Sequence, residues 1–331
     1  MTVLKSAIIG LGNIAQSHIQ AVKGGECGEV VAVCDIVPEK ITKYVDTHQL
    51  KVKTYTDYVQ MLDECDIDLV HICTPHYLHK EMIVSALKRN VNVLCEKPVC
   101  ISEEELVEIK VALENTKAKL GVVQQNRYNE SAKYMKSYLK DKKIRSGYAT
   151  LVWNRDEEYY SQDDWHGVLA KEGGGVIINQ ALHTLDLMQY YMGMPHSVCG
   201  KVDTFALKNI IDVEDTAVAR FYTENASFGI YATNTSEANF PVHIVFRLEG
   251  GEEAILFPAA VLTKEGYKTF VENKPLGKKC YGSGHEKLIA DFYECVKNDK
   301  PFAIDFNEAS KVAKMIFALY RSNGEMVEIK N

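Results

Sequence analysis

A regular alternation of short apolar runs with helical patterns constrains the fold of the first 123 residues more than any other feature. Apolar runs without polar alternation are typical of parallel strands that helices bury on both faces. Right-handed crossovers between such strands produce a doubly wound α/β domain. We expect strands over residues 4–9, 30–34, 69–73, 91–95 and 120–123, and helices over residues 13–23, 38–48, 76–90 and from Ser102 onward.

The turn between the first expected strand and its helix carries closely spaced glycines. Residues Gly10–Ala15 have the spacing G-x-G-x-x-A. In such a turn Gly10 permits the tight bend, Gly12 lets the backbone approach a pyrophosphate, and Ala15 allows the helix to pack closely on the strand. The helix N-terminus also offers free N–H groups to phosphates. The sequence therefore predicts a dinucleotide site that includes Gly10, Gly12, Asn13 and Ile14.

An acidic residue at the end of the second expected strand indicates which dinucleotide binds. Asp35 lies 23 residues after Gly12 and is followed by Ile36, Val37 and Pro38, with no arginine or lysine among them. A carboxylate in this place accepts hydrogen bonds from the ribose 2′-hydroxyl and repels a 2′-phosphate. We therefore expect NAD rather than NADP.

Two polar segments follow later strands of the expected sheet. Thr74-Pro75-His76 ends one strand, and Glu96-Lys97-Pro98 ends the next. Because ligands of open parallel sheets bind beyond the carboxyl ends of the strands, we expect both segments to line the cofactor crevice. Lys97 would then be a cation near the nicotinamide and the substrate. We also expect a cis Lys97–Pro98 bond, since a rigid bend would hold the lysine in place.

A third segment combines glycines with a polar ridge. Glu172 precedes three glycines, and an apolar helical pattern over residues 176–188 follows. Asn179 and His183 are four residues apart, which places them on one face of a helix, and Asp186 follows three residues later. A histidine on an apolar helix is often a satisfied core residue, but a buried polar ridge is costly without a purpose. The pattern favours a functional role for Asn179, His183 and Asp186.

Together these segments resemble the Gfo/Idh/MocA oxidoreductase family, which includes glucose–fructose oxidoreductase and inositol dehydrogenase. Further matching segments are residues 125–129, Trp165-His166-Gly167, residues 212–217 and Gly284-His285. The resemblance implies an N-terminal Rossmann domain, expected over residues 1–123, and a substrate-binding and oligomerisation domain over residues 124–331. It implies that the second domain is α+β with an open-faced, largely antiparallel sheet, and that Gln125 contacts the cofactor. Many family members carry aspartate where this chain has Asn179, an uncharged residue that still binds a hydroxyl.

The second half of the chain reads as a sheet domain closed by helices. Several of its runs alternate apolar with polar or small residues, which is typical of antiparallel strands with one covered face. An open sheet face would expose apolar surface, so we expect a homodimer or homotetramer that covers it. The expected strands are residues 149–155, 198–205, 216–222, 227–233, 243–248 and 253–257, and the expected helices are residues 284–297 and 307–322.

The residues singled out so far support hydride transfer between NAD and a secondary alcohol. His183 suits the role of base because an ordinary imidazole titrates near neutral pH. Lys97 would hydrogen-bond the same oxygen and stabilise a developing alkoxide, and family usage leaves the base open between the two. Asn179 would hold the substrate hydroxyl. Asp186 either orients His183 or is a structural partner.

Aromatic and cationic side chains before the triple glycine indicate the substrate. Aromatic faces stack on the C–H surfaces of sugars, while arginine and histidine reach hydroxyls, so we expect a sugar, a cyclitol or a sugar derivative. Two alternatives remain open: a glycoside-cleaving enzyme that oxidises its sugar transiently, and a non-catalytic NAD-binding regulator. The expected substrate contacts are Arg127, Tyr128, Trp153, Arg155, Tyr160, Trp165, His166, Asn179 and His183.

Composition excludes several other classes of partner. The formal net charge of −7 repels phosphate backbones, so we expect no nucleic acid. No apolar stretch approaches the roughly 18 residues of a membrane span, and the first residues lack the pattern of a secretion signal. The nine cysteines form no C-x-x-C pair, which predicts reduced thiols and a cytoplasmic protein. The spacing of His76 and His79 resembles a metal pair, but beside a cofactor helix we expect no metal.

Overall fold

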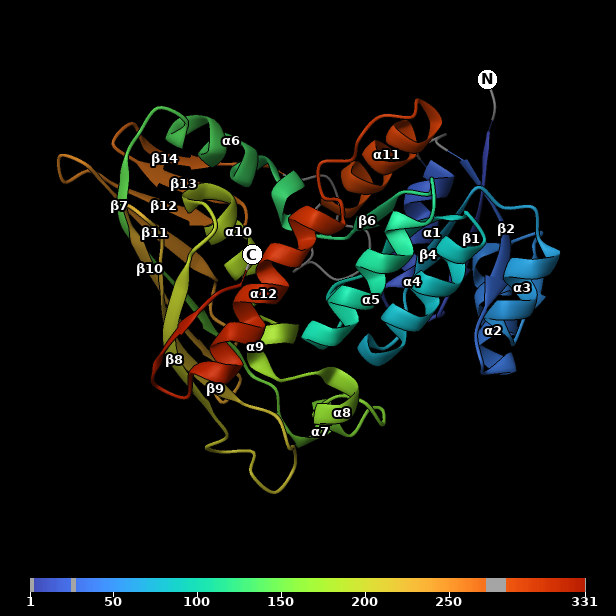
Figure 1. Ribbon diagram of the computed structural model, residues 1–331, viewed down its shortest axis with the longest axis horizontal. Coiled ribbons are helices and arrows are strands. Elements are labelled where there is room, and N and C mark those ends of the chain that lie inside the picture. The colour runs from blue at the N-terminus through green and yellow to red at the C-terminus, as the bar shows by residue number, and fades with distance from the viewer. Residues whose placement is uncertain (1–2, 25–27, 272–283, 331) are drawn as a thin grey trace. The chain divides into compact units, whose positions relative to one another are not determined.

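The computed structural model describes residues 3–24, 28–271 and 284–330, and the chain divides into two compact units. The first unit comprises the described residues up to 100, residues 104–125 and residues 284–309, and the second comprises residues 101–103, 126–271 and 310–330. Late residues join the first unit because α11 (Gly284–Lys297) packs against α1 (Ala15–Gly24), as Figure 1 shows. The sequence analysis, which placed a single boundary between residues 123 and 124, did not foresee that the chain returns to the first unit. That boundary between the functional domains stays a prediction.

The first unit is built on a six-stranded, wholly parallel sheet with strand order β3-β2-β1-β4-β5-β6. The order reverses between β1 and β4, which confirms the doubly wound fold expected from the alternation. The strands are β1 (Leu4–Ile9), β2 (Gly28–Cys34), β3 (Lys53–Tyr55), β4 (Leu69–Ile72), β5 (Asn92–Cys95) and β6 (Leu120–Val122).

Helices cover this sheet, and local signals set several of their ends. Pro38 begins α2 (Pro38–His48), where its missing N–H costs nothing. Asp57 caps α3 (Tyr58–Glu64) by accepting the N–H groups of Val59 and Gln60, a start that the sequence analysis missed together with β3. The remaining elements of this part of the chain are the short helix η1 (His76–Leu78), α4 (His79–Lys88) and α5 (Glu103–Glu114).

The second unit contains a nine-stranded sheet with order β14-β13-β12-β11-β7-β10-β9-β8-β15. Only the pair of β7 and β10 is parallel among the described strands of this sheet, so it is largely antiparallel as expected. The strands are β7 (Ile144–Val152), β8 (Ser197–Asp203), β9 (Thr216–Tyr222), β10 (Ser227–Thr233), β11 (His243–Leu248), β12 (Glu253–Phe257), β13 (Ala260–Thr263), β14 (Gly266–Thr269) and β15 (Met326–Glu328). The helices of this part of the chain are η2 (Gln125–Tyr128), α6 (Glu130–Leu139), α7 (Glu157–Tyr160), α8 (Leu169–Glu172), α9 (Val176–Asn179), α10 (Leu182–Met192) and α12 (Phe306–Ser322).

Two expectations about this unit are wrong. The continuous helix over residues 176–188 is broken between α9 and α10, because the N–H of Ala181 turns back to the carbonyl of Val176 at 2.8 Å. Asn179 and His183 therefore belong to different helices instead of one helix face. The strand expected over residues 149–155 begins earlier, at Ile144, and ends at Val152.

Among the described residues no helix combines the length and the apolar character that crossing a bilayer requires.

Candidate active site

The glycine turn after β1 has the geometry of a dinucleotide loop. Gly10 has φ +85°, and a Cβ there would stand 2.7 Å from the carbonyl oxygen of Cys73. Its N–H donates to the Cys34 carbonyl at 2.8 Å, so the turn lies against the next strand. A Cβ on Gly12 would meet none of the described atoms within 4 Å, which leaves its backbone open to a ligand. Only glycine fits the first position, and the second is free for phosphate approach.

Asp35 connects this turn to the end of β2. Its Oδ2 accepts the N–H of Leu11 at 2.8 Å, and its Oδ1 accepts the N–H of Val37 at 2.9 Å. The side chain of Ile36, between them in the chain, is exposed. The carboxylate predicted to read the ribose is thus held rigidly by backbone donors beside the glycine turn.

The segments after β4 and β5 lie next to each other because these strands are neighbours in the sheet. His79 connects them: its Nδ1 lies 2.7 Å from the carbonyl oxygen of Pro98, and its Nε2 lies 2.9 Å from that of Thr74. The Lys97–Pro98 bond is cis, as expected. Burial lowers the pKa of His79, and the hydrogen bonds to the carbonyls of Pro98 and Thr74 oppose this effect. The structure therefore brings Thr74, Pro75, His76 and Lys97 to one edge of the sheet.

Glu96 faces a buried histidine network that the sequence analysis did not foresee. Its Oε1 lies 3.0 Å from Nε2 of His18 and 3.5 Å from Nε2 of His285. Burial raises the pKa of this carboxyl, but the hydrogen bonds from the two histidines outweigh that effect and hold the pKa well below its usual range. The cofactor role expected for Glu96 stays a prediction. Its carboxylate contacts buried histidines and so holds the chain in place directly before Lys97.

The network continues from His18 to His71 and Tyr293. Its Nδ1 lies 2.7 Å from Nδ1 of His71, whose Nε2 lies 2.8 Å from the hydroxyl of Tyr293. Burial lowers the pKa of His71 well below its usual value, so this ring is neutral. The donor in each of these contacts depends on which ring nitrogens of His18 and His71 carry the protons. Every member finds a partner, although the residues come from α1, β4, α11 and the end of β5.

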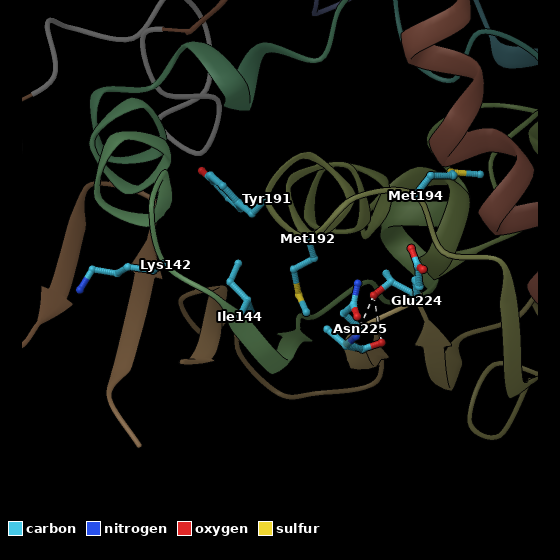
Figure 2. A pocket seen from close by; sticks show the side chains of 9 residues that line it. Lys142, Ile144, Tyr191, Met192, Met194, Glu224 and Asn225 are labelled. Atoms are coloured by element: carbon cyan, nitrogen blue, oxygen red, sulfur yellow. Dashed lines mark hydrogen bonds between the residues drawn. The ribbon is translucent and has the colours of Figure 1, made fainter. Parts of the chain in front are cut away.

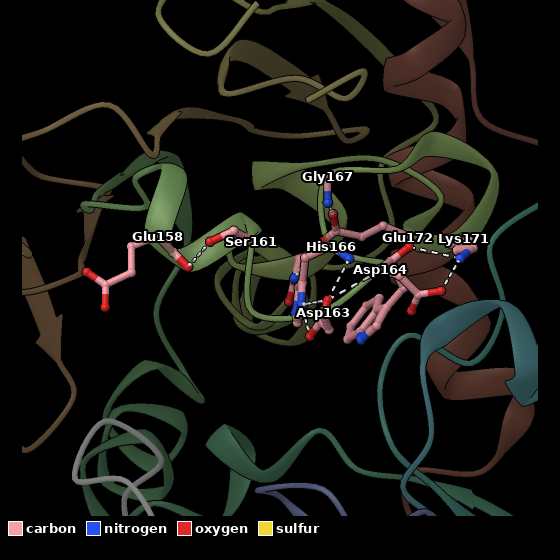
Figure 3. Close-up of polar contacts among 10 residues, drawn as sticks. Glu158, Ser161, Asp163, Asp164, His166, Gly167, Lys171 and Glu172 are labelled. Carbon is pink, nitrogen blue, oxygen red and sulfur yellow. Dashed lines mark hydrogen bonds and ion pairs between the residues drawn. The ribbon is translucent and has the colours of Figure 1, made fainter. Parts of the chain in front are cut away.

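In the second unit a buried carboxylate holds the segment before the glycines. Glu172 is 1% exposed; its Oε2 accepts the N–H of Gly167 at 2.5 Å, and its Oε1 accepts Nδ2 of Asn179. Figure 3 shows the carboxyl group of Glu172 reaching Gly167, with the pairs Asp163–His166 and Asp164–Lys171 nearby. Asn179, at the end of α9, is therefore oriented by an acid seven residues earlier.

The triple glycine serves close packing of the backbone. A Cβ on Gly175 would collide with the carbonyl oxygen of Glu214, and one on Gly174 would collide with the Tyr320 hydroxyl. The Glu214 carboxylate accepts the N–H of Gly175 at 2.7 Å, the N–H of Ile177 at 3.0 Å and the hydroxyl of Tyr320 at 3.0 Å. Burial raises the pKa of Glu214 against these hydrogen bonds. The start of α9 is thus held by a second buried acid.

Arg127 and Asp186 form a buried ion pair. Nε and Nη2 of Arg127 donate to the two oxygens of Asp186 at 2.8 and 2.6 Å, and Nη2 also donates to Gln189 at 3.1 Å. The guanidinium lies 4.5 Å from the centre of the Tyr190 ring. Arg127 and Asp186, predicted as substrate contact and catalytic residue, therefore support α10, whose second residue is the half-buried His183. Tyr128 lies beneath the ammonium of Lys133, 5.5 Å from its ring centre.

The predicted aromatic substrate contacts are joined through Tyr159, whose ring centre lies 5.0 Å from that of Tyr160 and 5.1 Å from that of His166. The guanidinium of Arg155 lies 4.9 Å from the Trp153 ring and 5.0 Å from that of Tyr159. Trp165 stacks on His166 with ring centres 3.7 Å apart. The Tyr160 hydroxyl accepts from the buried Asn234, which also donates to Gln180. The sequence analysis missed Asn234 because it lies 74 residues from its tyrosine partner.

A separate hollow of about 330 Å³ opens at the other end of the second sheet (Figure 2). It lies near the start of β7 and the turn between β9 and β10, whereas Trp153 and Asn234 follow the ends of β7 and β10. None of the predicted site residues lines it. Its lining residues are Lys142, Ile144, Tyr191, Met192, Met194, Thr223, Glu224, Asn225 and Ala226. The described residues contain no group of three or more histidine, cysteine or acidic side chains able to hold a metal ion.

Comparison with known proteins places the chain among curated and solved relatives. It is 29% identical over 188 residues to the uncharacterized oxidoreductase YrbE of Bacillus subtilis, which covers 57% of this chain and 53% of that protein. It is 27% identical over 216 residues to inositol 2-dehydrogenase of Rhizobium meliloti, covering 65% and 63%. The chain thus spans less than two thirds of the length of these relatives.

Solved structures share the whole fold. The WlbA dehydrogenase of Bordetella pertussis, solved with NADH and UDP-GlcNAcA, superposes with a TM-score of 0.85 at 24% identity and full coverage of both chains. A levoglucosan dehydrogenase complex with NADH and levoglucosan reaches a TM-score of 0.88 at 19% identity, again over both full chains. Residues 4–124 match the oxidoreductase family with an NAD-binding Rossmann fold, and residues 143–252 match the GFO/IDH/MocA C-terminal domain. The chain therefore belongs to the Gfo/Idh/MocA family of NAD-binding oxidoreductases.

Proposed function

We propose that this protein is an NAD-dependent dehydrogenase that moves hydride between the nicotinamide and a secondary hydroxyl of a sugar, sugar derivative or cyclitol. The observation that carries the proposal is the edge of the first sheet, where the glycine turn, Asp35 and Lys97 follow β1, β2 and β5. The open space at Gly12 and the rigid carboxylate of Asp35 fit a dinucleotide without 2′-phosphate. NAD, when bound, accepts or returns the hydride.

The protein's own residues handle the proton and the oxygen of the substrate. We assign His183 to the transfer of the hydroxyl proton, since a half-buried imidazole suits this step near neutral pH. We assign Lys97 to the stabilisation of negative charge that develops on a substrate oxygen. Asn179 holds a substrate hydroxyl, and the Arg127–Asp186 pair supports the helix that carries His183.

Named relatives and the aromatic groups support a polyol substrate. Several similar curated proteins are named inositol 2-dehydrogenase, and a structural neighbour was solved with levoglucosan. In this chain the flat faces of Trp153 and Trp165, each beside a cationic or imidazole group, suit the stacking and hydrogen bonding of a sugar ring. Both observations support this substrate class.

A second candidate is a reaction without net oxidation. A relative that is 28% identical over 194 residues is named 2,7-anhydro-N-acetylneuraminate hydratase. In the redox-neutral candidate, this protein would oxidise a sugar transiently, allow a bond to break by elimination, and then restore the dinucleotide. This candidate predicts turnover of a glycoside or anhydro-sugar without accumulation of NADH.

One assay separates these possibilities. The absorbance of NADH is followed while the protein meets inositols, free sugars, nucleotide sugars, anhydro-sugars and aryl glycosides, with NAD⁺ and NADP⁺ in parallel. NADH formation with a polyol supports the dehydrogenase, whereas product release without NADH supports the redox-neutral reaction. Tight dinucleotide binding without turnover of any compound contradicts both and favours a regulator.

We further propose that the protein forms a homodimer or homotetramer through the second sheet. One face of this sheet carries a row of apolar side chains that the strand register makes continuous from β7 to β14. The row comprises Tyr148, Val245, Ile255, Leu262 and Tyr267, of which Val245 is buried, and the exposed Tyr231 of β10 lies opposite Thr150 of β7 on the same face. An apolar row of this extent is typical of a surface covered by a partner.

A cytoplasmic location is also proposed. The seven described cysteines form no disulfide, which supports a reducing compartment, while Cys27 and Cys280 lie outside the described residues. Cell fractionation tests this proposal, and recovery of the protein from a secreted fraction contradicts it.

A further inference from the structure

The side-chain amide of Asn179 is held in one orientation by a buried acid. Glu172 is 1% exposed, whereas Asn179 is half-buried at the end of α9. One carboxyl oxygen of Glu172 accepts the backbone N–H of Gly167 at 2.5 Å, and the other accepts from Nδ2 of Asn179. Both oxygens of the carboxyl group thus accept N–H donors, the pattern of an ionised carboxylate.

This contact decides which end of the Asn179 amide faces away from Glu172. A carboxylate oxygen is only an acceptor, so the amide must turn its NH₂ group to Glu172. The carbonyl oxygen Oδ1 then points to the other side of the planar group. An asparagine held in this way offers an acceptor where a freely rotating amide offers either an acceptor or a donor.

We propose that Glu172 is a positioning residue that fixes Asn179 with its carbonyl oxygen toward the substrate, so that the site requires a hydroxyl donating to that oxygen. The inference rests on the proposed function, because it assigns a polarity to the substrate contact of Asn179. It also distinguishes the two buried acids of this segment: Glu214 binds backbone and Tyr320, and Glu172 binds a predicted site residue.

The sharpest test inverts the polarity of the pair and then restores it. In Glu172→Gln the new amide keeps its oxygen on the Gly167 N–H and turns its NH₂ toward Asn179. Two NH₂ groups cannot pair, so Asn179 rotates and presents a donor to the substrate. We expect kcat/KM to fall about 10- to 100-fold, the usual consequence of a mispaired polar contact.

The double variant Glu172→Gln with Asn179→Asp exchanges amide and acid. The glutamine introduced by the first substitution then donates to the new carboxylate, which again presents an acceptor, and the Gly167 contact is kept. We expect the double variant to recover most of the lost kcat/KM. Glu214→Gln is the matched control: it replaces the other buried acid, which contacts the start of α9, and Asn179→Asp should not rescue it.

A readout without substrate separates this inference from the proposed function. Asn179→Asp alone places two carboxylates in contact, so we expect a lowered melting temperature at pH 7.5 that recovers toward pH 5, when one acid takes a proton. The added Glu172→Gln should abolish that pH dependence. Stability coupling without any turnover rejects the proposed function and keeps the oriented pair. An active wild type whose Glu172→Gln variant keeps full kcat/KM, or whose double variant is no better than the single one, overturns the inference.

Discussion

At the scale of single residues, the site depends on acids that are held by backbone donors. Asp35, Glu172 and Glu214 each accept at least one backbone N–H group, and each lies where a glycine or a strand end brings the backbone close. Such carboxylates cannot rotate away, because N–H donors fix both of their oxygens. We expect Asp35 to set the preference of the first unit among dinucleotides, and Glu172 holds the amide of Asn179 in the second unit.

The coenzyme preference tests the reading of Asp35. Asp35→Ser removes the charge that repels a 2′-phosphate, so the ratio of kcat/KM for NAD to that for NADP should shrink about 10- to 100-fold. Steady-state kinetics with both coenzymes measures this ratio. Asp57→Ser, at the start of α3, keeps a helix cap and should leave the ratio unchanged. A wild type that uses NADPH as well as NADH contradicts the prediction.

The proposed chemistry rests on two side chains whose removal can be separated from cofactor binding. His183→Ala and Lys97→Met should each lower kcat by about 100- to 10,000-fold, the usual contribution of a proton-transfer group. The dissociation constant for NADH, followed by its fluorescence, should stay nearly the same. Either variant with normal turnover removes that residue from the mechanism.

At the scale of elements, the parts that carry the site are joined by buried polar contacts in addition to apolar packing. His18 of α1, His71 of β4 and Tyr293 of α11 form a connected line that ends at Glu96. Such a chain of contacts fixes α1, β4 and α11 relative to one another, since each polar side chain finds its hydrogen-bond partner only when all three elements are in place.

This network should make stability depend on pH in one direction. Folding lowers the pKa of His71 below its ordinary value of 6.5 and the pKa of Glu96 below its ordinary value of 4.5. As the pH falls below each ordinary value, the unfolded chain therefore binds more protons at that residue than the folded chain does. Their contribution is complete above those values and is lost as the pH falls. Each such proton lowers the free energy of unfolding by up to about 1.4 kcal/mol per pH unit.

Urea unfolding between pH 7.5 and 5.5 measures the effect of His71. The variant His71→Val with Tyr293→Phe should be less stable at pH 7.5 but should lose less stability on acidification. Tyr293→Phe alone keeps the buried imidazole and should keep the steep dependence. Equal slopes for the double variant and the wild type would show that His71 does not titrate on unfolding.

The glycines before α9 should tolerate no side chain. Gly175→Ala drives a methyl group into the carbonyl of Glu214, and we expect a loss of about 2 to 4 kcal/mol in the free energy of unfolding. In β10, a Cβ on Gly229 meets its nearest described neighbour at 3.5 Å, so Gly229→Ala should cost far less. Chemical denaturation of both variants makes the comparison.

At the scale of the whole molecule, the two units carry different tasks. The first contains the dinucleotide turn and Lys97, and the second contains Asn179, His183 and the uncovered sheet face. The chain makes this division although residues from its far end complete the first unit. The proposed dinucleotide site and the proposed association face thus belong to separate sheets.

Association through the second sheet is tested at its apolar row. Tyr148→Lys with Tyr231→Lys adds two charges to the exposed side of β7 and β10 and should convert the oligomer to a monomer at micromolar concentration. Sedimentation velocity measures the change. Val107→Lys, on the exposed side of α5, should leave the assembly intact. A wild type that is already monomeric rejects the proposed interface.

Local signals in the sequence determined much of the first unit. The apolar runs and the spacing of Gly10 and Gly12 are signals that act within a few residues. Asp35 stands at the end of the second strand, a fixed position in this fold. The doubly wound sheet and its ligand-binding edge could therefore be predicted. The strands over residues 216–222 and 227–233 were confirmed with the same bounds because their alternation is uninterrupted.

Only the tertiary structure decided contacts between residues far apart in the chain. Glu96 meets His18 and His285, and Asp186 meets Arg127, across separations that no local pattern encodes. The break between Asn179 and His183, where the N–H of Ala181 bonds to the carbonyl of Val176, was likewise missed, because the local apolar periodicity favoured one helix. Periodicity indicates which face of an element is buried, but it does not indicate which distant side chain that face contacts.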